Sequence, residues 1–128
     1  SSAASDVYKR QADGSTLAVG AMAEAGNGRG FNANQADRSA GGAGAAYLFQ
    51  RSGSTWAQKA YLKAPNADAG DLFGASMALS GDGKTLAIGA TAENSLTTGL
   101  QGNQADNSAL PGVPSYGVPT GVGAVYLY

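Results

Sequence analysis

The chain of 128 residues contains no cysteine and no histidine. Their absence excludes disulfides, thiol nucleophiles, imidazole bases and the usual zinc ligands, so no Ser-His-Asp triad can form within these residues. Charge is also sparse, with eight basic and nine acidic residues and a net charge of −1. This balance gives no electrostatic footprint for nucleic acid and no polybasic patch for a membrane surface. No stretch approaches the ~20 apolar residues of a membrane span.

The chain is rich in glycine, with 20 residues, and in alanine, serine and asparagine. This composition is typical of turns and short strands rather than of long helices. Apolar residues alternate with polar ones in short runs that are bounded by turn residues, which predicts strands. Tight hairpins are expected at 51–54 and 80–84, and long polar loops at 23–41 and 92–120. The predicted strands are 16–19, 44–50, 55–63, 73–79, 84–88 and 122–128.

An internal repeat organises the chain. The string DGSTLAVGA at 13–21 returns as DGKTLAIGA at 82–90, a spacing of 69 residues that also relates NQAD at 34–37 to NQAD at 103–106. The string GAAYLF at 44–49 returns as GAVYLY at 123–128, about ten residues further apart. A repeat unit cannot usually bury its apolar face alone. We therefore expect the chain to be part of a larger repeat array.

The N-terminal end falls outside the repeat pattern, and the C-terminal end lies within it. No residue of 4–10 matches its counterpart in 73–79, and residues 1–11 are similar to a translated sequencing adaptor of the transposon type. We interpret residues 1–11 as a non-native scar and leave them out of the fold prediction, with a natural N-terminal arm as the alternative. Tyr128 stands inside an apolar alternation. The expectation is a fragment from environmental DNA that is cut at both ends.

A family resemblance rests on two short motifs. Phe73-Gly74, followed after a hairpin by Gly89-Ala90-Thr91, resembles the FG-GAP repeat of integrin α subunits and of many bacterial secreted proteins. The proline of that signature is replaced by Met22 and Thr91 in the two copies. The resemblance implies an all-β fold, a partial β-propeller of four-stranded antiparallel blades. Residues 12–64 would form the C-terminal part of one blade, and residues 72–128 most of the next.

The resemblance also raises the question of calcium. In integrin-type blades the calcium loop lies between the first two strands, but here that place holds only Asp82 beside Lys84, so we expect a plain hairpin with Asp82 as a turn former. The long loops are the better candidates, because Ca²⁺ takes six to eight oxygen ligands. The alternative is that these side chains cap turns. The candidate ligands are Glu93, Asn103, Asp106 and Asn107; the first three recur as Glu24, Asn34 and Asp37, whereas Arg38 stands at the place of Asn107.

Other side chains have two possible roles. Six aromatic residues could line a carbohydrate platform, but their positions in strand alternations favour packing between blades. Lys59 and Lys63 are predicted on a solvated strand face, and Asp68 and Asp71 as polar loop residues. The six aromatic residues are Tyr47, Phe49, Trp56, Tyr61, Tyr126 and Tyr128.

These observations predict a non-catalytic binding or adhesion module on a secreted or surface-exposed bacterial protein. Its partners would be a protein or carbohydrate ligand, bound through the long loops, and neighbouring propeller blades. Two alternatives remain open: an accessory propeller of an extracellular hydrolase, and a purely structural surface repeat. A fold alone does not decide among them.

Overall fold

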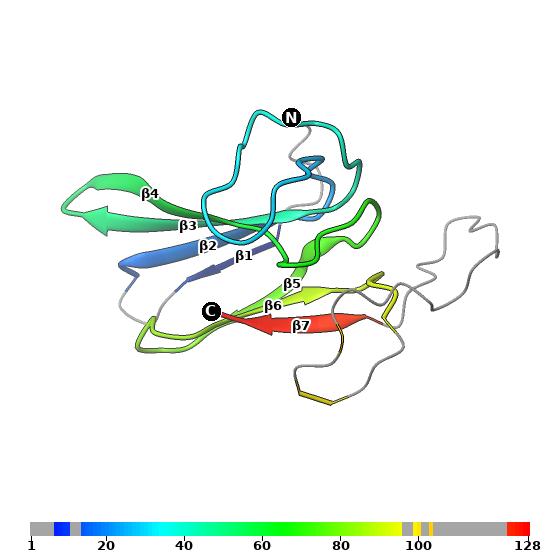
Figure 1. The fold of residues 1–128 in the computed structure, drawn as a ribbon. Helices are drawn as coiled ribbons and strands as arrows, with labels where there is room; N and C mark the ends of the chain where they lie inside the picture. Colours follow the sequence, from blue (N-terminus) through cyan, green and yellow to red (C-terminus); the bar gives the residue numbers. More distant parts are fainter. Residues whose placement is uncertain (1–6, 11–13, 96–98, 101–102, 104–122) are drawn as a thin grey trace.

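The computed structural model describes residues 7–10, 14–95, 99–100, 103 and 123–128, with the backbone alone for 7–10. Seven strands form two antiparallel sheets that are stacked as layers (Figure 1). The described residues contain no helix, and so none that could cross a membrane. The first sheet has the order β1 (Val7–Arg10), β2 (Thr16–Ala21), β3 (Ala45–Ser52), β4 (Thr55–Leu62), and the second the order β5 (Phe73–Leu79), β6 (Leu86–Ala90), β7 (Ala124–Leu127).

All six predicted strands form, and the two sheets repeat the same register. Ala18 faces Leu48 across β2 and β3, as Ala87 faces Leu127 across β6 and β7. The additional strand β1 lies in the segment that the sequence led us to leave out. Val7 faces Gly20 as Ser76 faces Gly89, so β1 takes the place of β5 without sharing a residue with it.

The hairpin between β5 and β6 is closed by an aspartate, as predicted. Asp82 Oδ1 accepts hydrogen bonds from the Lys84 backbone N–H at 3.1 Å and from the Ser80 hydroxyl at 2.6 Å. These bonds, from Ser80 first, lower the pKa of Asp82. Asp82 therefore acts as a turn former.

One apolar core lies between the two sheets. It combines small residues of the first sheet, such as Ala18 and Ala46, with large residues of the second, such as Phe73 and Ile88. Alternate side chains of a strand point to opposite faces, so Ala46 and Leu48 face the second sheet while their neighbours in β3 face away. Alanine at the contact lets the two backbones approach closely.

The Phe-Gly motif stands where the two repeats touch. Phe73 is fully buried, and its N–H donates to the Ala43 carbonyl at 3.1 Å. Gly74 has φ +92°, and a Cβ at this position would lie 2.5 Å from the Ala45 carbonyl oxygen. A side chain at Gly20 would in turn collide with the Gly74 carbonyl. Glycine is required because the strands approach each other through their backbones.

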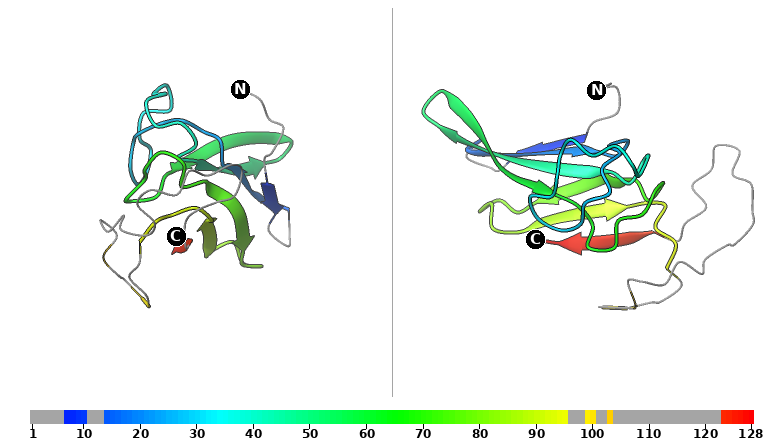
Figure 2. Two further views of the ribbon diagram at one scale, coloured as in Figure 1. Left: turned by 90° about the vertical axis from the view of Figure 1, so that its right-hand side faces the viewer. Right: turned by 45° about the horizontal axis from the view of Figure 1, so that its top comes forward.

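The long connections gather at one end of the two sheets. The segment between β2 and β3, the linker between β4 and β5, and residues 91–95 after β6 lie at this end, as Figures 1 and 2 show. Backbone hydrogen bonds join them: Leu72 N–H donates to the Gly42 carbonyl at 3.0 Å, and Ala92 N–H to the Asp71 carbonyl at 3.1 Å. This loop end carries the predicted site residues that the structure describes.

Candidate functional site at the loop end

The recurring glutamate closes the base of each long loop. The Glu24 carbonyl accepts the Gly44 N–H at 2.9 Å, and the Glu93 carbonyl accepts the Gly123 N–H at 3.0 Å. The side chains also repeat their bonding, since each carboxylate accepts the backbone N–H two residues on, from Gly26 at 2.9 Å or Ser95 at 3.1 Å. Both glutamates thus tie a long loop to the end of its sheet. We call these two arrangements, at Glu24 and at Glu93, the first and the second glutamate turn.

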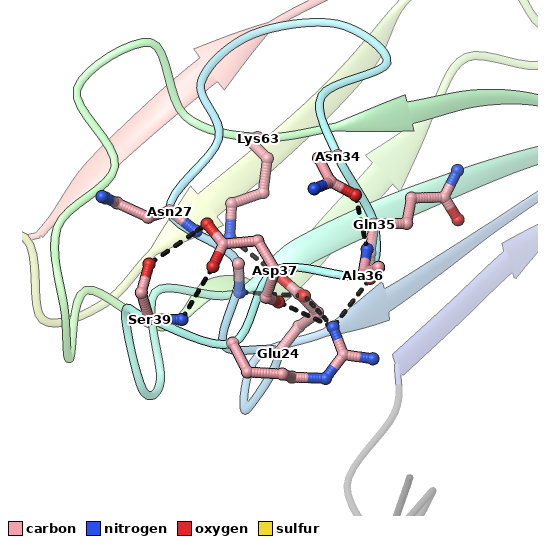
Figure 3. Close-up of polar contacts among 10 residues, drawn as sticks. Glu24, Asn27, Asn34, Gln35, Ala36, Asp37, Ser39 and Lys63 are labelled. Atoms are coloured by element: carbon pink, nitrogen blue, oxygen red, sulfur yellow. Dashed lines mark hydrogen bonds and ion pairs between the residues drawn. The ribbon is translucent and has the colours of Figure 1, made fainter.

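Lys63 completes the first glutamate turn. Its Nζ donates to Glu24 Oε2 at 2.8 Å, and its side chain has no exposed surface (Figure 3). The prediction of a solvated strand face holds for Lys59, which is exposed, and is wrong for Lys63. The physical reason is that the first long loop covers this end of the first sheet: the Lys63 N–H donates to the Gly30 carbonyl at 2.9 Å, and Glu24 lies against the Lys63 ammonium.

The lysine decides the charge state of this turn. Burial by itself would raise the pKa of Glu24, but hydrogen bonds from Lys63 and Gly26 outweigh it, and the pKa lies below its ordinary value. Burial, together with the adjacent Glu24 carboxylate, raises the pKa of Tyr61. Glu24 is therefore a paired carboxylate inside the protein, and its charge is already compensated.

The predicted ligands Asn34 and Asp37 cap turns within the first loop (Figure 3). Asp37 accepts the N–H groups of Asn27 at 2.9 Å and Ser39 at 3.0 Å, and these bonds lower its pKa, with the bond from Asn27 contributing most. Asn34 Oδ1 accepts the Ala36 N–H at 3.0 Å. With its oxygens bonded to protein donors, this loop does not fit a calcium site.

Arg38 adds a second cation to the first loop. Its guanidinium lies 3.7 Å from Glu24 Oε1 and donates to the carbonyls of Gln35 and Asp37, both at 2.7 Å. The Glu24 carboxylate therefore has Lys63 and Arg38 as cationic neighbours. A bound metal ion would have to displace or tolerate both, which supports turn capping as the role of these residues.

The second glutamate turn has neutral donors instead. Asn66 Nδ2 donates to Glu93 Oε1 at 3.1 Å, and Asn66 Oδ1 accepts the Tyr126 hydroxyl at 2.6 Å. Glu93 is 2% exposed, and among the described residues no lysine or arginine pairs with it. Burial first, and then the nearby Glu93 carboxylate, raise the pKa of Tyr126 to about 12.

Asp71 brings another carboxylate close to this turn. It is 2% exposed, and its Oδ2 accepts the Asp68 N–H at 2.8 Å. Burial raises the pKa of Asp71 to about 6, helped by the carboxylates of Asp68 and Glu93 and opposed by the Asp68 hydrogen bond. Asp71 lies in a loop, as predicted, but it is buried there, where its carbonyl accepts a hydrogen bond from the Ala92 N–H.

The second loop can be tested for calcium only in part. The Asn103 carbonyl accepts the Ser95 hydroxyl at 3.2 Å, while Asp106 and Asn107 lie outside the described residues. Within the described residues, no three acidic, histidine or cysteine side chains form a cluster that could hold a metal. Glu93, with neutral donors only, suits a cation better than Glu24 does. Calcium binding by the second loop stays a prediction.

The aromatic side chains pack rather than form a platform. Tyr61 is fully buried and lies 5.2 Å from the Tyr47 ring, and the Tyr126 ring lies 5.5 Å from that of Phe73. Trp56 is 37% exposed and stands apart, with the Arg51 guanidinium 6.0 Å above its ring. Packing between the two sheets is confirmed for Tyr126, whereas Tyr47 and Tyr61 pack against each other on the side of the first sheet away from the second.

Comparison with known proteins gives one match. A family model described as FG-GAP repeat matches residues 56–106, which span β4, the linker, β5, β6 and part of the second long loop. No curated protein and no solved structure matches the chain. The matched segment includes the buried Phe73, the close backbone approach at Gly74 and the Glu93 turn.

Proposed function

The chain is an FG-GAP repeat protein, and from this premise we propose that it is a non-catalytic β-propeller segment that presents its long loops as a binding surface. The observation that carries the proposal is the recurring glutamate turn. Glu24 and Glu93 each fix the base of a long loop to a rigid sheet, at the same end of both sheets. Loops held on a rigid scaffold are a common way to build a binding site.

The chemistry of the first loop supports recognition of a polar ligand. Its exposed side chains include Asn27, Arg29, Asn34 and Gln35, which offer amide and guanidinium groups for hydrogen bonds to a protein or a carbohydrate. Catalysis is not part of the proposal, since the sequence has neither histidine nor cysteine. We place the protein at the cell surface or outside the cell, as an adhesion module.

Binding to immobilised probes tests this proposal. The full chain, labelled with a fluorophore, is applied to arrays of glycans and of extracellular matrix proteins. We expect binding that the double variant Arg29→Ala, Gln35→Ala reduces at least several-fold, while Gln58→Ala on β4, also exposed, leaves it unchanged. Binding that is equal for all three proteins, or absent from every probe, would contradict a role of the loop in recognition.

The proposal includes a calcium ion for the second loop, where Asp106 would add a carboxylate to that of Glu93. Support comes from the charge of the Glu93 turn, which lacks the lysine that neutralises Glu24. Thermal unfolding with CaCl2 or MgCl2 tests it. Calcium alone should raise Tm, and Asp106→Asn should remove the effect, whereas Asp37→Asn should not. A Tm that does not respond to calcium removes the ion from the proposal.

A further inference from the structure

Corresponding strands of the two repeats leave opposite faces uncovered. Ala46 and Leu48 of β3 face the second sheet and join the core between the sheets. Their equivalents in β7, at a spacing of 79 residues, are Val125 and Leu127, which are 71% and 70% exposed. The second sheet therefore presents to solvent the same apolar face that the first sheet buries. We name this the leading face.

The opposite face of each sheet shows the reverse pattern: it is covered in the second sheet and faces away from the core in the first. Tyr126 of β7 and Tyr128, directly after it, point toward the first sheet, and the Tyr128 hydroxyl donates a hydrogen bond to the Lys63 carbonyl at 2.9 Å. Their equivalents in β3 are Tyr47 and Phe49, which lie on the side of the first sheet away from the core and are half-buried. We name this side of the first sheet the trailing face.

The long loops add a third element to the contact. Phe31 of the first loop reaches across to the second sheet, and its ring meets Tyr128 edge-on with 5.4 Å between centroids. At the repeat spacing of 69, Leu100 is the equivalent of Phe31 and is 98% exposed. Both residues follow a glycine with positive φ, Gly30 at +71° and Gly99 at +88°. Leu100 thus has the position of a contact residue but contacts no second sheet.

We propose that the leading face of one chain docks on the trailing face of a second copy of the same chain, and so repeats between molecules the contact that joins the two sheets within one. Leu100 of one copy then meets Phe49 of the next, as Phe31 meets Tyr128. The two surfaces fit because each is the repeat equivalent of a surface that already packs against the other. This inference rests on the packing of the sheets and not on the binding role proposed above.

The geometry of such a contact determines the assembly. Leading and trailing faces differ, so the contact is head-to-tail and produces a ring if the rotation closes or a filament if it does not. Propellers close with about four to eight blades, and each copy brings two sheets. The expected assembly is a ring of roughly two to four copies.

Sedimentation velocity of the full chain over a range of concentrations tests the proposal. The wild-type chain should associate to a defined small oligomer. Leu127→Glu blocks the leading face, Phe49→Glu blocks the trailing face, and each variant alone should sediment as a monomer. Lys84→Glu, in the exposed hairpin between β5 and β6, is the matched control and should associate like the wild type.

Mixing the two blocked variants distinguishes the head-to-tail contact from other associations. Each variant keeps one good face, so an equimolar mixture should form a one-to-one heterodimer and nothing larger. Dimers made by two identical faces would survive in one of the variants and gain nothing from mixing. A wild-type chain that stays monomeric at every concentration, or a mixture without heterodimer, overturns the proposal.

A cross-link keeps the proposal testable if Phe49→Glu fails to fold. The chain has no cysteine, so Leu100→Cys and Phe49→Cys chains form disulfides only at the introduced positions. Mixed in air, they should form the heterodimer in several-fold excess over Leu100→Cys homodimers. A mixture of Leu100→Cys with Lys84→Cys serves as the control. Equal yields of the heterodimer in both mixtures would contradict the proposed contact.

Discussion

Glu24 and Glu93 occupy the same place in the two repeats, yet their surroundings differ in charge. The first carboxylate is bonded to the buried ammonium of Lys63, and the second to the amide of Asn66, with the carboxyl of Asp71 close by. The backbone bond at the base of each loop is the same, since the glutamate carbonyl accepts the N–H of Gly44 or of its equivalent Gly123. The comparison shows that the repeat specifies a backbone turn, while the linker between the sheets, which supplies both Lys63 and Asn66, sets the electrostatics.

The largest effect is expected from removing the cation of the first turn. Lys63→Met leaves the buried Glu24 carboxylate with only the exposed Arg38 guanidinium, 3.7 Å away, as a cationic neighbour, which costs about 3–5 kcal/mol in the free energy of unfolding. Urea unfolding at neutral pH measures it. Lys59→Met, on the exposed part of β4, should change the same quantity by less than ~0.5 kcal/mol.

A second substitution shows whether charge is the cause. Adding Glu24→Gln to Lys63→Met removes the unpaired buried charge and should recover much of the lost stability. If the double variant is as unstable as Lys63→Met alone, the loss comes from packing of the lysine stem and not from the carboxylate.

The next prediction concerns the pH dependence of stability, which should differ between the two glutamate turns. The pKa of Asp71 is raised from 3.8 to about 6, so its contribution to stability is full below pH 3.8 and is lost as the pH rises through about 6. Asp71→Asn should abolish this loss and raise the free energy of unfolding at neutral pH by on the order of 1–3 kcal/mol. Unfolding free energies measured across this pH range, for wild type and variant, test it.

The first turn should respond to pH in the opposite direction. The pKa of Glu24 is lowered from 4.5, so the contribution of its ion pair is present above this pH and is lost as the pH falls through the lower folded value. Asp71→Asn should therefore retain an acid-induced loss of stability that Glu24→Gln reduces. The same pH profile in both variants would show that the two carboxyl groups are not electrostatically distinct.

A smaller effect is expected from the neutral partner in the second turn. Asn66→Ala removes the hydrogen bonds to Glu93 and Tyr126 and should cost about 1–3 kcal/mol, whereas Tyr126→Phe, which removes one of them, should cost ~1 kcal/mol. Thermal unfolding measures both. Asn27→Ala, an exposed residue of the first loop, is the control and should change stability little. Equal losses for Asn27→Ala and Asn66→Ala would contradict the assigned role of Asn66.

The smallest effect concerns the residue two positions after each glutamate. A Cβ at Gly26 would lie 2.9 Å from the Tyr61 hydroxyl and 3.0 Å from Glu24 Oε1, whereas its equivalent Ser95 already carries a side chain. Gly26→Ser should cost ~1 kcal/mol through this crowding. Ser95→Gly should cost about as much, because the bond to the Asn103 carbonyl is lost. Thermal unfolding measures both variants. A higher Tm for Gly26→Ser would mean that the space beside Tyr61 and Glu24 accommodates a side chain.

The sequence predicted the strands and singled out the recurring glutamates, as candidate calcium ligands with turn capping as the alternative, because both recur at a fixed spacing. It did not predict Lys63 and Asn66 as partners of the glutamates, because these contacts join residues 39 and 27 positions apart and come from a linker that occurs once in the chain. The buried state of Asp71 was missed for the same reason, since it depends on a bond to Ala92. Periodicity reveals what each repeat shares, and the partners that differ between repeats depend on tertiary contacts.

The shared register of β1 and β5 has a consequence for the engineering of such repeats. Val7-Tyr8-Lys9-Arg10 and Ser76-Met77-Ala78-Leu79 have no residue in common, yet each pairs with its neighbour at the same offset. The adjoining strand thus selects its partner through backbone hydrogen bonds and accepts unrelated side chains. A position of this kind can receive a grafted peptide, so that the sheet itself would hold a displayed epitope in an extended conformation.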